Sequence, residues 1–144
     1  MKVLIINGPN LNLLGKREQD IYGNQDFNSF FRTLKESYPE VQLSYFQSNH
    51  AGELVDKLQE ADQEVDGIIL NAAAYTHTSL ALGDAVKAIS TPVYEVHLTN
   101  TMSREEIRHI SFISPGAEAI VMGFGLDSYR LALEGLLRKQ KKTG

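Results

Sequence analysis

Short runs of aliphatic and β-branched residues alternate along the chain with longer segments in which apolar residues recur every three or four positions. The short runs have the length of strands and are bounded by turn residues, whereas the longer segments have the spacing of amphipathic helices. We therefore expect five strands, at Val3–Ile6, Val41–Phe46, Gly67–Leu70, Val93–Val96 and Ala119–Met122.

Residues that cap or break helices indicate where the helices begin and end. Asp26 is the expected N-cap of the first helix, because its side chain can accept hydrogen bonds from free backbone N–H groups. The pair Tyr38-Pro39 is expected to end that helix. Ser103, with two glutamates shortly after it, predicts a shorter helix beyond the fourth strand, and the last helix is expected to run from about Ser128 to Lys139.

Strands and helices alternate strictly, which favours a parallel α/β sheet with right-handed crossovers and helices on both faces. Five strands favour the doubly wound order 2-1-3-4-5, in which the first, third and fourth strands lie side by side. Such sheets bind their ligands at the carboxyl ends of these strands. Polar segments beginning at Asn7, Asn71 and His97 follow all three strands, so we expect the functional site there.

The segment from Asn7 to Asn24 is an unusually long connection between a strand and a helix. Loops of this length are usually disordered or functional lids, and the several leucine and isoleucine residues within the segment argue against disorder. We expect Gly8 to Leu14 to form a fixed floor at the end of the first strand. Gly15 to Gly23 is expected to be the part that moves.

Composition excludes several classes of protein. The chain of 144 residues is expected to fold as one domain over residues 1–144. It has no cysteine, which excludes disulfides, thiolate metal sites and a cysteine nucleophile. A formal net charge of −4 does not favour binding to nucleic acid. No apolar run is long enough to span a bilayer and no secretory signal is visible, so we expect a cytoplasmic protein without membrane contacts.

The usual cofactor motifs are also missing. The first strand is followed by NGPNLN, which is neither of the common glycine-rich phosphate-binding motifs. The lone Gly123-Phe124-Gly125 is more typical of a turn between a strand and a helix. We therefore expect no bound dinucleotide, triphosphate or flavin.

Five segments of the sequence together resemble the type II 3-dehydroquinate dehydratases: GPNLNLLGKRE, IYG, NAAAYTHTS, EVHLTN and SREEIRHIS. The resemblance implies a three-layer, flavodoxin-like fold and the dehydration of 3-dehydroquinate to 3-dehydroshikimate. It implies an anti elimination through an enolate, without metal or cofactor, in the shikimate or quinate pathway. Ala72-Ala73 and Thr99 depart from the proline and serine that the family often has there, but both keep the small size or the hydroxyl group.

The resemblance implies catalytic roles for five residues. Tyr22 matches the base that removes the proton next to the carbonyl. A phenol, with a pKa of about 10 in water, needs a nearby cation to act as a base at neutral pH, and Arg17 is the expected supplier. Asn10 matches the asparagine that holds a water molecule against the enolate. His97 matches the proton donor to the leaving hydroxyl, and Glu95, on the same face of the strand, is expected to orient its imidazole.

The resemblance also implies a set of residues that bind the substrate. The backbone amides of Leu98 and Thr99, with the Thr99 hydroxyl, are expected to hold the carboxylate. Contacts to the remaining hydroxyl groups are expected from Asn71, His77 and Arg108. Taken alone, Arg108 could instead be a solvated charge that pairs with a neighbouring glutamate. His50 and His109 are interpreted as structural or surface residues.

Asp84 lies on the helix after THTS, where an exposed acid would be ordinary. In the family, the matching aspartate reaches into the site of a neighbouring subunit, within trimers that assemble to a dodecamer. Two other classes of function stay open: another cofactor-free enzyme acting on a small acid, and a flavodoxin-like binding module. The sequence does not distinguish a biosynthetic from a catabolic role.

Overall fold

The computed structural model describes residues 1–16 and 19–143. Its centre is a parallel sheet in the order β2-β1-β3-β4-β5, which confirms the predicted topology. The strands lie at the predicted places, with ends that differ by one residue at most: β1 Lys2–Asn7, β2 Gln42–Gln47, β3 Gly67–Asn71, β4 Val93–His97 and β5 Ala119–Met122.

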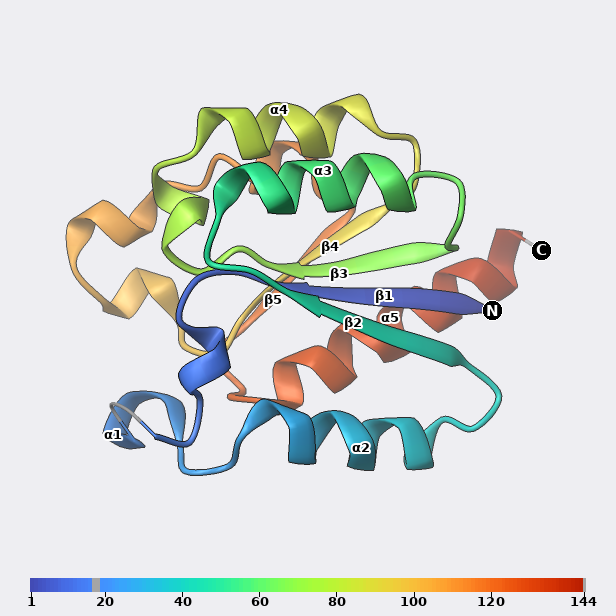
Figure 1. Ribbon diagram of the computed structural model, residues 1–144, viewed down its shortest axis with the longest axis horizontal. Helices are drawn as coiled ribbons and strands as arrows, with labels where there is room; N and C mark the ends of the chain where they lie inside the picture. Colours follow the sequence, from blue (N-terminus) through green and yellow to red (C-terminus); the bar gives the residue numbers. More distant parts are fainter. Residues whose placement is uncertain (17–18, 144) are drawn as a thin grey trace.

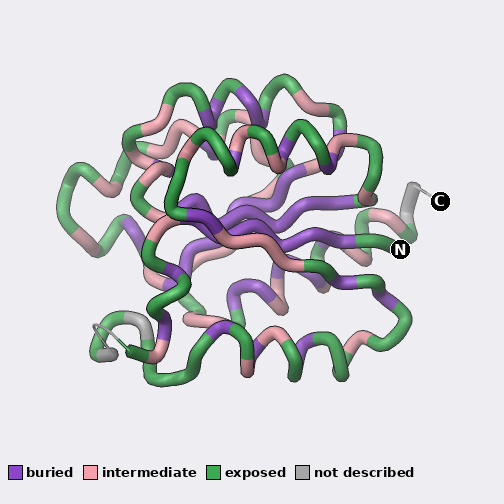
Figure 2. The backbone as a smooth tube through the Cα atoms, in the orientation of Figure 1, coloured by how far each residue is buried: buried purple, intermediate pink, exposed green. Residues whose placement is uncertain are grey.

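Two layers of helices cover the sheet, as Figure 1 shows. One face carries α3 (Ala51–Ala61) and α4 (Leu80–Ala88), and the other carries α2 (Phe27–Ser37) and α5 (Asp127–Thr143). The buried backbone is concentrated in the strands and on the inner sides of the helices (Figure 2). Each face of the sheet thus has its own hydrophobic core, and the predicted three-layer fold is confirmed.

The predicted limits of the helices are confirmed in part. The Asp26 side chain accepts a hydrogen bond from Ser29 N at 2.7 Å and caps α2, which ends before Tyr38. The predicted helix starting at Ser103 is wrong, because the chain there forms two short 3-10 turns, Thr101–Ser103 and Glu106–His109. Ser103 does not act as a cap, since its hydroxyl donates to the Asn100 carbonyl oxygen at 2.7 Å.

The long segment after β1 contains more regular structure than a plain loop. Leu11–Leu13 form a 3-10 turn and Gln19–Tyr22 form α1, a single helical turn. The last helix, α5, is longer than predicted at both ends. Within the part of the chain that the structure describes, none of the helices has the length and hydropathy that crossing a bilayer requires.

Gly83→Ala is expected to destabilise the fold by about 1–3 kcal/mol. A Cβ atom on Gly83 would collide with the carbonyl oxygen of Phe112, and a backbone atom cannot rotate out of the way. The matched control is Gly135→Ala in α5, where no atom lies within 4 Å of the added Cβ. Alanine there should stabilise the helix by about 0.5–1 kcal/mol. Urea denaturation measures both changes, and a Gly83→Ala protein as stable as the parent would contradict the expected collision.

Candidate active site

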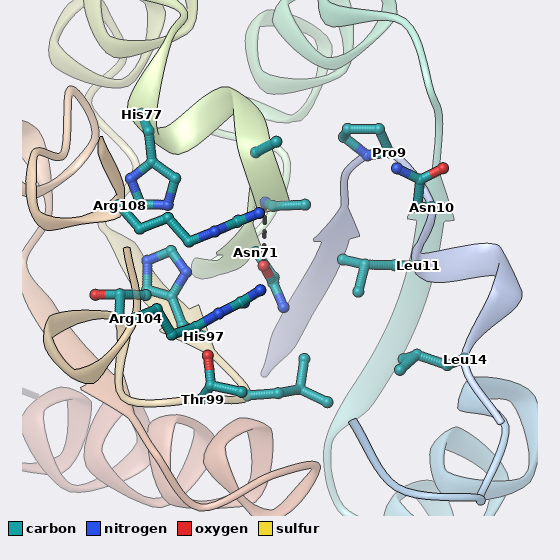
Figure 3. A pocket seen from close by; sticks show the side chains of 14 residues that line it. Pro9, Asn10, Leu11, Leu14, Asn71, His77, His97, Thr99, Arg104 and Arg108 are labelled. Atoms are coloured by element: carbon teal, nitrogen blue, oxygen red, sulfur yellow. Dashed lines mark hydrogen bonds between the residues drawn. The ribbon is translucent and has the colours of Figure 1, made fainter. Parts of the chain in front are cut away.

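A pocket opens at the carboxyl ends of β1, β3 and β4, where the sheet topology predicts a ligand site (Figure 3). It brings together residues that are far apart in the sequence but were all predicted to bind or act on a ligand. They are Asn10, Asn71, His77, His97, Leu98, Thr99 and Arg108. Glu95 lies directly behind His97.

The turn after β1 is fixed tightly against β3. Gly8 N donates to the Asn71 carbonyl oxygen at 2.8 Å. A Cβ atom on Gly8 would lie 2.6 Å from the Ala72 carbonyl oxygen, so this close approach requires glycine. Asn10 adopts a left-handed conformation with φ of 71°, which asparagine tolerates better than most residues. Its backbone N donates to Asn49 Oδ1 at 3.0 Å, and these contacts fix the backbone that carries the Asn10 side chain.

His97 and Glu95 form a buried pair at the end of β4. His97 Nε2 lies 2.5 Å from Glu95 Oε2, and the two residues are 6% and 1% exposed. The carboxylate also accepts from the hydroxyls of Ser114 at 2.5 Å and Ser111 at 3.1 Å. Burial alone would raise the pKa of Glu95, but the hydrogen bonds from His97 and the two serines hold it below its ordinary value. A charged Glu95 therefore accepts the Nε2 hydrogen, which leaves Nδ1 to exchange a proton with a ligand.

His77 lies beside His97 on one side of the pocket, with the ring centroids 6.1 Å apart and 23° between the ring planes (Figure 3). Its Nδ1 lies 2.7 Å from the Ile110 carbonyl oxygen, which can only accept, so Nδ1 carries the hydrogen. Burial lowers the pKa of His77, and the neighbouring His97 and Arg108 lower it further. His77 is therefore neutral at neutral pH, and its Nε2 can accept a hydrogen bond from a ligand hydroxyl.

Two arginines reach into the pocket and point toward Asn71 in Figure 3. Arg108 was predicted: its Nε donates to Glu105 at 2.6 Å, as in the alternative interpretation, and it also lines the pocket, while its contact with a substrate hydroxyl stays a prediction. Arg104 was missed, although it lies within the SREEIRHIS segment. The two guanidinium groups make the pocket suitable for a small anion.

Leu98 and Thr99 follow β4 and form part of the pocket wall. They were predicted to precede a helix that would attract an anion, but the first turn after them is a 3-10 turn of only three residues, capped by Asn100. Any attraction of an anion to this wall therefore comes from individual backbone N–H groups and from Arg104, rather than from a helix dipole.

The structure does not bring every predicted residue into the pocket. Asp84 is exposed on α4 and is absent from the pocket lining of this chain. Arg17 and the side chain of Tyr22 lie outside the described residues. The backbone of Tyr22 ends α1, and its neighbours Ile21 and Gly23 line a second hollow together with Leu98 and Thr99. The helical turn that carries Tyr22 therefore lies beside the rim of the pocket.

The remaining two histidines have no place in the pocket lining. His109 Nε2 lies 2.9 Å from the Arg104 carbonyl oxygen, and His50 is exposed before α3. Contacts behind the pocket were also missed by sequence reasoning. They involve Ser111 and Ser114 behind Glu95, and Tyr129 behind Asn71.

Comparisons with known proteins agree on one family. The family model described as dehydroquinase class II matches residues 1–137. A 3-dehydroquinate dehydratase from Prochlorococcus marinus (strain NATL1A) is 50% identical over 99% of this chain and all of that protein. One from Campylobacter lari is also 50% identical, over 96% of this chain and 88% of that protein. The crystal structure of type II dehydroquinase from Butyrivibrio crossotus, 43% identical, covers 94% of this chain and 97% of that chain with a TM-score of 0.91. With this agreement over nearly its whole length, the chain belongs to the class II dehydroquinase family.

Proposed function

We propose that this chain carries out the dehydration of 3-dehydroquinate to 3-dehydroshikimate that its family membership indicates, using the residues of the pocket at the ends of β1, β3 and β4. The observation that carries the proposal is the buried His97–Glu95 pair, 2.5 Å apart and open on one side to the pocket. Losing water from a β-hydroxy ketone requires an acid for the departing hydroxyl, a base for the adjacent proton and a donor to the enolate.

In this proposal different residues supply the base, the donor to the enolate and the acid. Tyr22, activated by Arg17, removes the proton next to the carbonyl when the segment Gly15–Gly23 closes over the pocket. Asn10 holds the water molecule that donates a hydrogen bond to the enolate oxygen. His97 then gives its proton to the leaving hydroxyl, and this step completes an anti elimination.

The same pocket offers complementary groups for the rest of the substrate. The carboxylate is assigned to the backbone amides of Leu98 and Thr99 and to the Thr99 hydroxyl. The ring hydroxyls are assigned to Asn71, neutral His77 and Arg108. Two arginines in a pocket with apolar leucine walls suit a small anion with one apolar ring face.

The proposal includes an assembly of trimers into a dodecamer in the cytoplasm, with Asp84 reaching into a neighbouring site. Three exposed aliphatic side chains support it. Leu80, one turn before Asp84 on α4, is 64% exposed, and Ile107 and Ile110 near the pocket are 63% and 61% exposed. Light scattering of the purified protein tests the assembly, and a monomer at assay concentration would exclude a role for Asp84 in a second subunit.

An absorbance assay tests the activity. The purified protein with 3-dehydroquinate should produce the near-ultraviolet absorbance of a conjugated enone, at an unchanged rate in the presence of a metal chelator. Borohydride added with the substrate should not inactivate it, because no Schiff base forms in this mechanism. No enone, or a covalent adduct trapped on a lysine, would show that the proposed reaction or its mechanism is wrong.

A further inference from the structure

Tyr129 links two asparagines at the ends of neighbouring strands. Its side chain is fully buried near the start of α5. Its hydroxyl donates to Asn7 Oδ1 at 2.7 Å and accepts from Asn71 Nδ2 at 2.9 Å. Asn7 and Asn71 are the last residues of β1 and β3 and are paired in the sheet register. One hydroxyl group therefore connects three elements directly behind the pocket.

These bonds allow only one orientation of the Asn71 amide. Asn71 Oδ1 accepts from Ala73 N at 3.1 Å, and Nδ2 gives one hydrogen to Tyr129. Rotating the amide by half a turn would place two donors, Nδ2 and Ala73 N, against each other. It would also place Oδ1 against a hydroxyl that already gives its only hydrogen to Asn7. Burial raises the pKa of Tyr129, so the hydroxyl keeps that hydrogen at neutral pH.

Asn7 forms the other end of this hydrogen-bond network. Its Nδ2 is buried and makes no hydrogen bond within the described part of the chain. Burial raises the pKa of Tyr45, and the Tyr45 hydroxyl is close enough to the Asn7 side chain for their interaction to lower that pKa in part. Asn7 Oδ1 accepts the hydrogen of Tyr129 and thereby determines which way the hydroxyl points.

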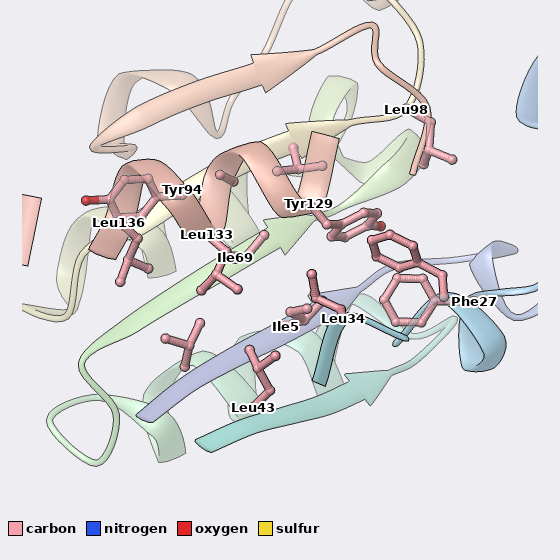
Figure 4. Close-up of a cluster of buried hydrophobic side chains, with 14 of the residues drawn as sticks. Ile5, Phe27, Leu34, Leu43, Ile69, Tyr94, Leu98, Tyr129, Leu133 and Leu136 are labelled. Atoms are coloured by element: carbon pink, nitrogen blue, oxygen red, sulfur yellow. The ribbon is translucent and has the colours of Figure 1, made fainter. Parts of the chain in front are cut away.

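We infer that Tyr129 is a positioning residue, which fixes the Asn71 amide so that its second Nδ2 hydrogen stays available to the bound substrate. The inference rests on the proposed function, in which Asn71 binds a substrate hydroxyl. Tyr129 acts through Asn71, which lines the pocket. The Tyr129 ring is itself held by Phe27, at 5.1 Å between centroids and 65° between planes (Figure 4).

Tyr129→Phe tests the inference by removing only the hydroxyl. We expect KM for 3-dehydroquinate to rise about tenfold, which corresponds to about 1.4 kcal/mol. The change in kcat should stay within about twofold, because the hydrogen bond to a ring hydroxyl is made in the ground and transition states alike. The matched control is Tyr94→Phe, at the other end of the same core and 3% exposed, which should leave KM unchanged (Figure 4). A lower melting temperature with an unchanged KM would show that Tyr129 is only structural.

A double-mutant cycle shows whether Tyr129 acts through Asn71. If it does, adding Tyr129→Phe to Asn71→Ala should raise KM no further, whereas additive effects would overturn the inference. Should Tyr129→Phe fail to fold, Asn7→Ala tests the same series of hydrogen bonds from Asn7 instead of Tyr129. Without that acceptor, the Tyr129 hydrogen can turn toward Asn71, and the same rise in KM is expected.

A measurement without substrate separates this inference from the proposed function. In the parent protein, NMR should show slow exchange with water for the Nδ2 hydrogen that Asn71 donates to Tyr129, and Tyr129→Phe should accelerate it about tenfold or more. Tyr94→Phe should not change it. Unchanged exchange in Tyr129→Phe overturns the inference. Absence of dehydratase activity in the parent protein overturns the proposed function, and the exchange rates still decide the role of Tyr129.

Discussion

Tyr22→Phe is expected to lower kcat about 10³-fold, within the range that a general base contributes. The substitution keeps the ring and removes only the hydroxyl that accepts the substrate proton in the proposed mechanism. Tyr22 ends α1, and the residues on either side of it line a hollow that shares Leu98 and Thr99 with the pocket. The rate of enone formation measures the effect, and the affinity for added 3-dehydroshikimate should change little.

Tyr38→Phe is the matched control for this prediction. Tyr38 follows α2, away from the pocket, and its hydroxyl donates to Glu134 at 2.6 Å. Its removal should leave kcat unchanged. A Tyr22→Phe enzyme with an undiminished rate would exclude Tyr22 as the base. A structure with a bound analogue in which Tyr22 pointed into solvent would contradict the proposed closure as well.

The central strands of the sheet were predictable because they are buried on both faces. β3 and β4 are buried at every position, so each appears in the sequence as a short apolar run between turn residues. The order of the strands then followed from the alternation with helices, and it placed Asn71 and His97 at one edge of the sheet. The pocket is at that edge, which confirms this part of the prediction.

Other features depend on contacts that no local pattern records. Tyr129 reaches Asn7 across 122 positions in the sequence, and Ser114 reaches Glu95 across 19. The chain after β4 forms 3-10 turns instead of the predicted helix. The Asn100 side chain caps the first turn, and the Ser103 hydroxyl donates to the Asn100 carbonyl oxygen. Only the tertiary structure shows which polar side chains support the residues that face the ligand.

His97→Ala is expected to lower kcat by about 10²–10⁴-fold, the contribution of a positioned acid. His97 lines the pocket, and its Nε2 is engaged by Glu95, so Nδ1 is the nitrogen that can donate to the leaving hydroxyl. Added imidazole should restore part of the rate, because it fills the space that the side chain vacates. The matched control is His50→Ala, an exposed histidine before α3, which should keep the parent rate.

Glu95→Gln removes the carboxylate that orients His97 but keeps the imidazole that acts as the acid. The loss of kcat should be smaller than for His97→Ala, since the imidazole remains but loses the carboxylate that orients it. Stability gives a second measure. The pKa of Glu95 in the folded protein lies below its ordinary value. Its carboxylate therefore stabilises the fold fully when the pH is above the ordinary pKa of a glutamate, and this stabilisation is lost as the pH falls through the lowered pKa. Glu95→Gln should therefore flatten the acid side of the stability curve. An unchanged acid side together with an unchanged kcat would show that Glu95 neither holds His97 nor supports the proposed acid.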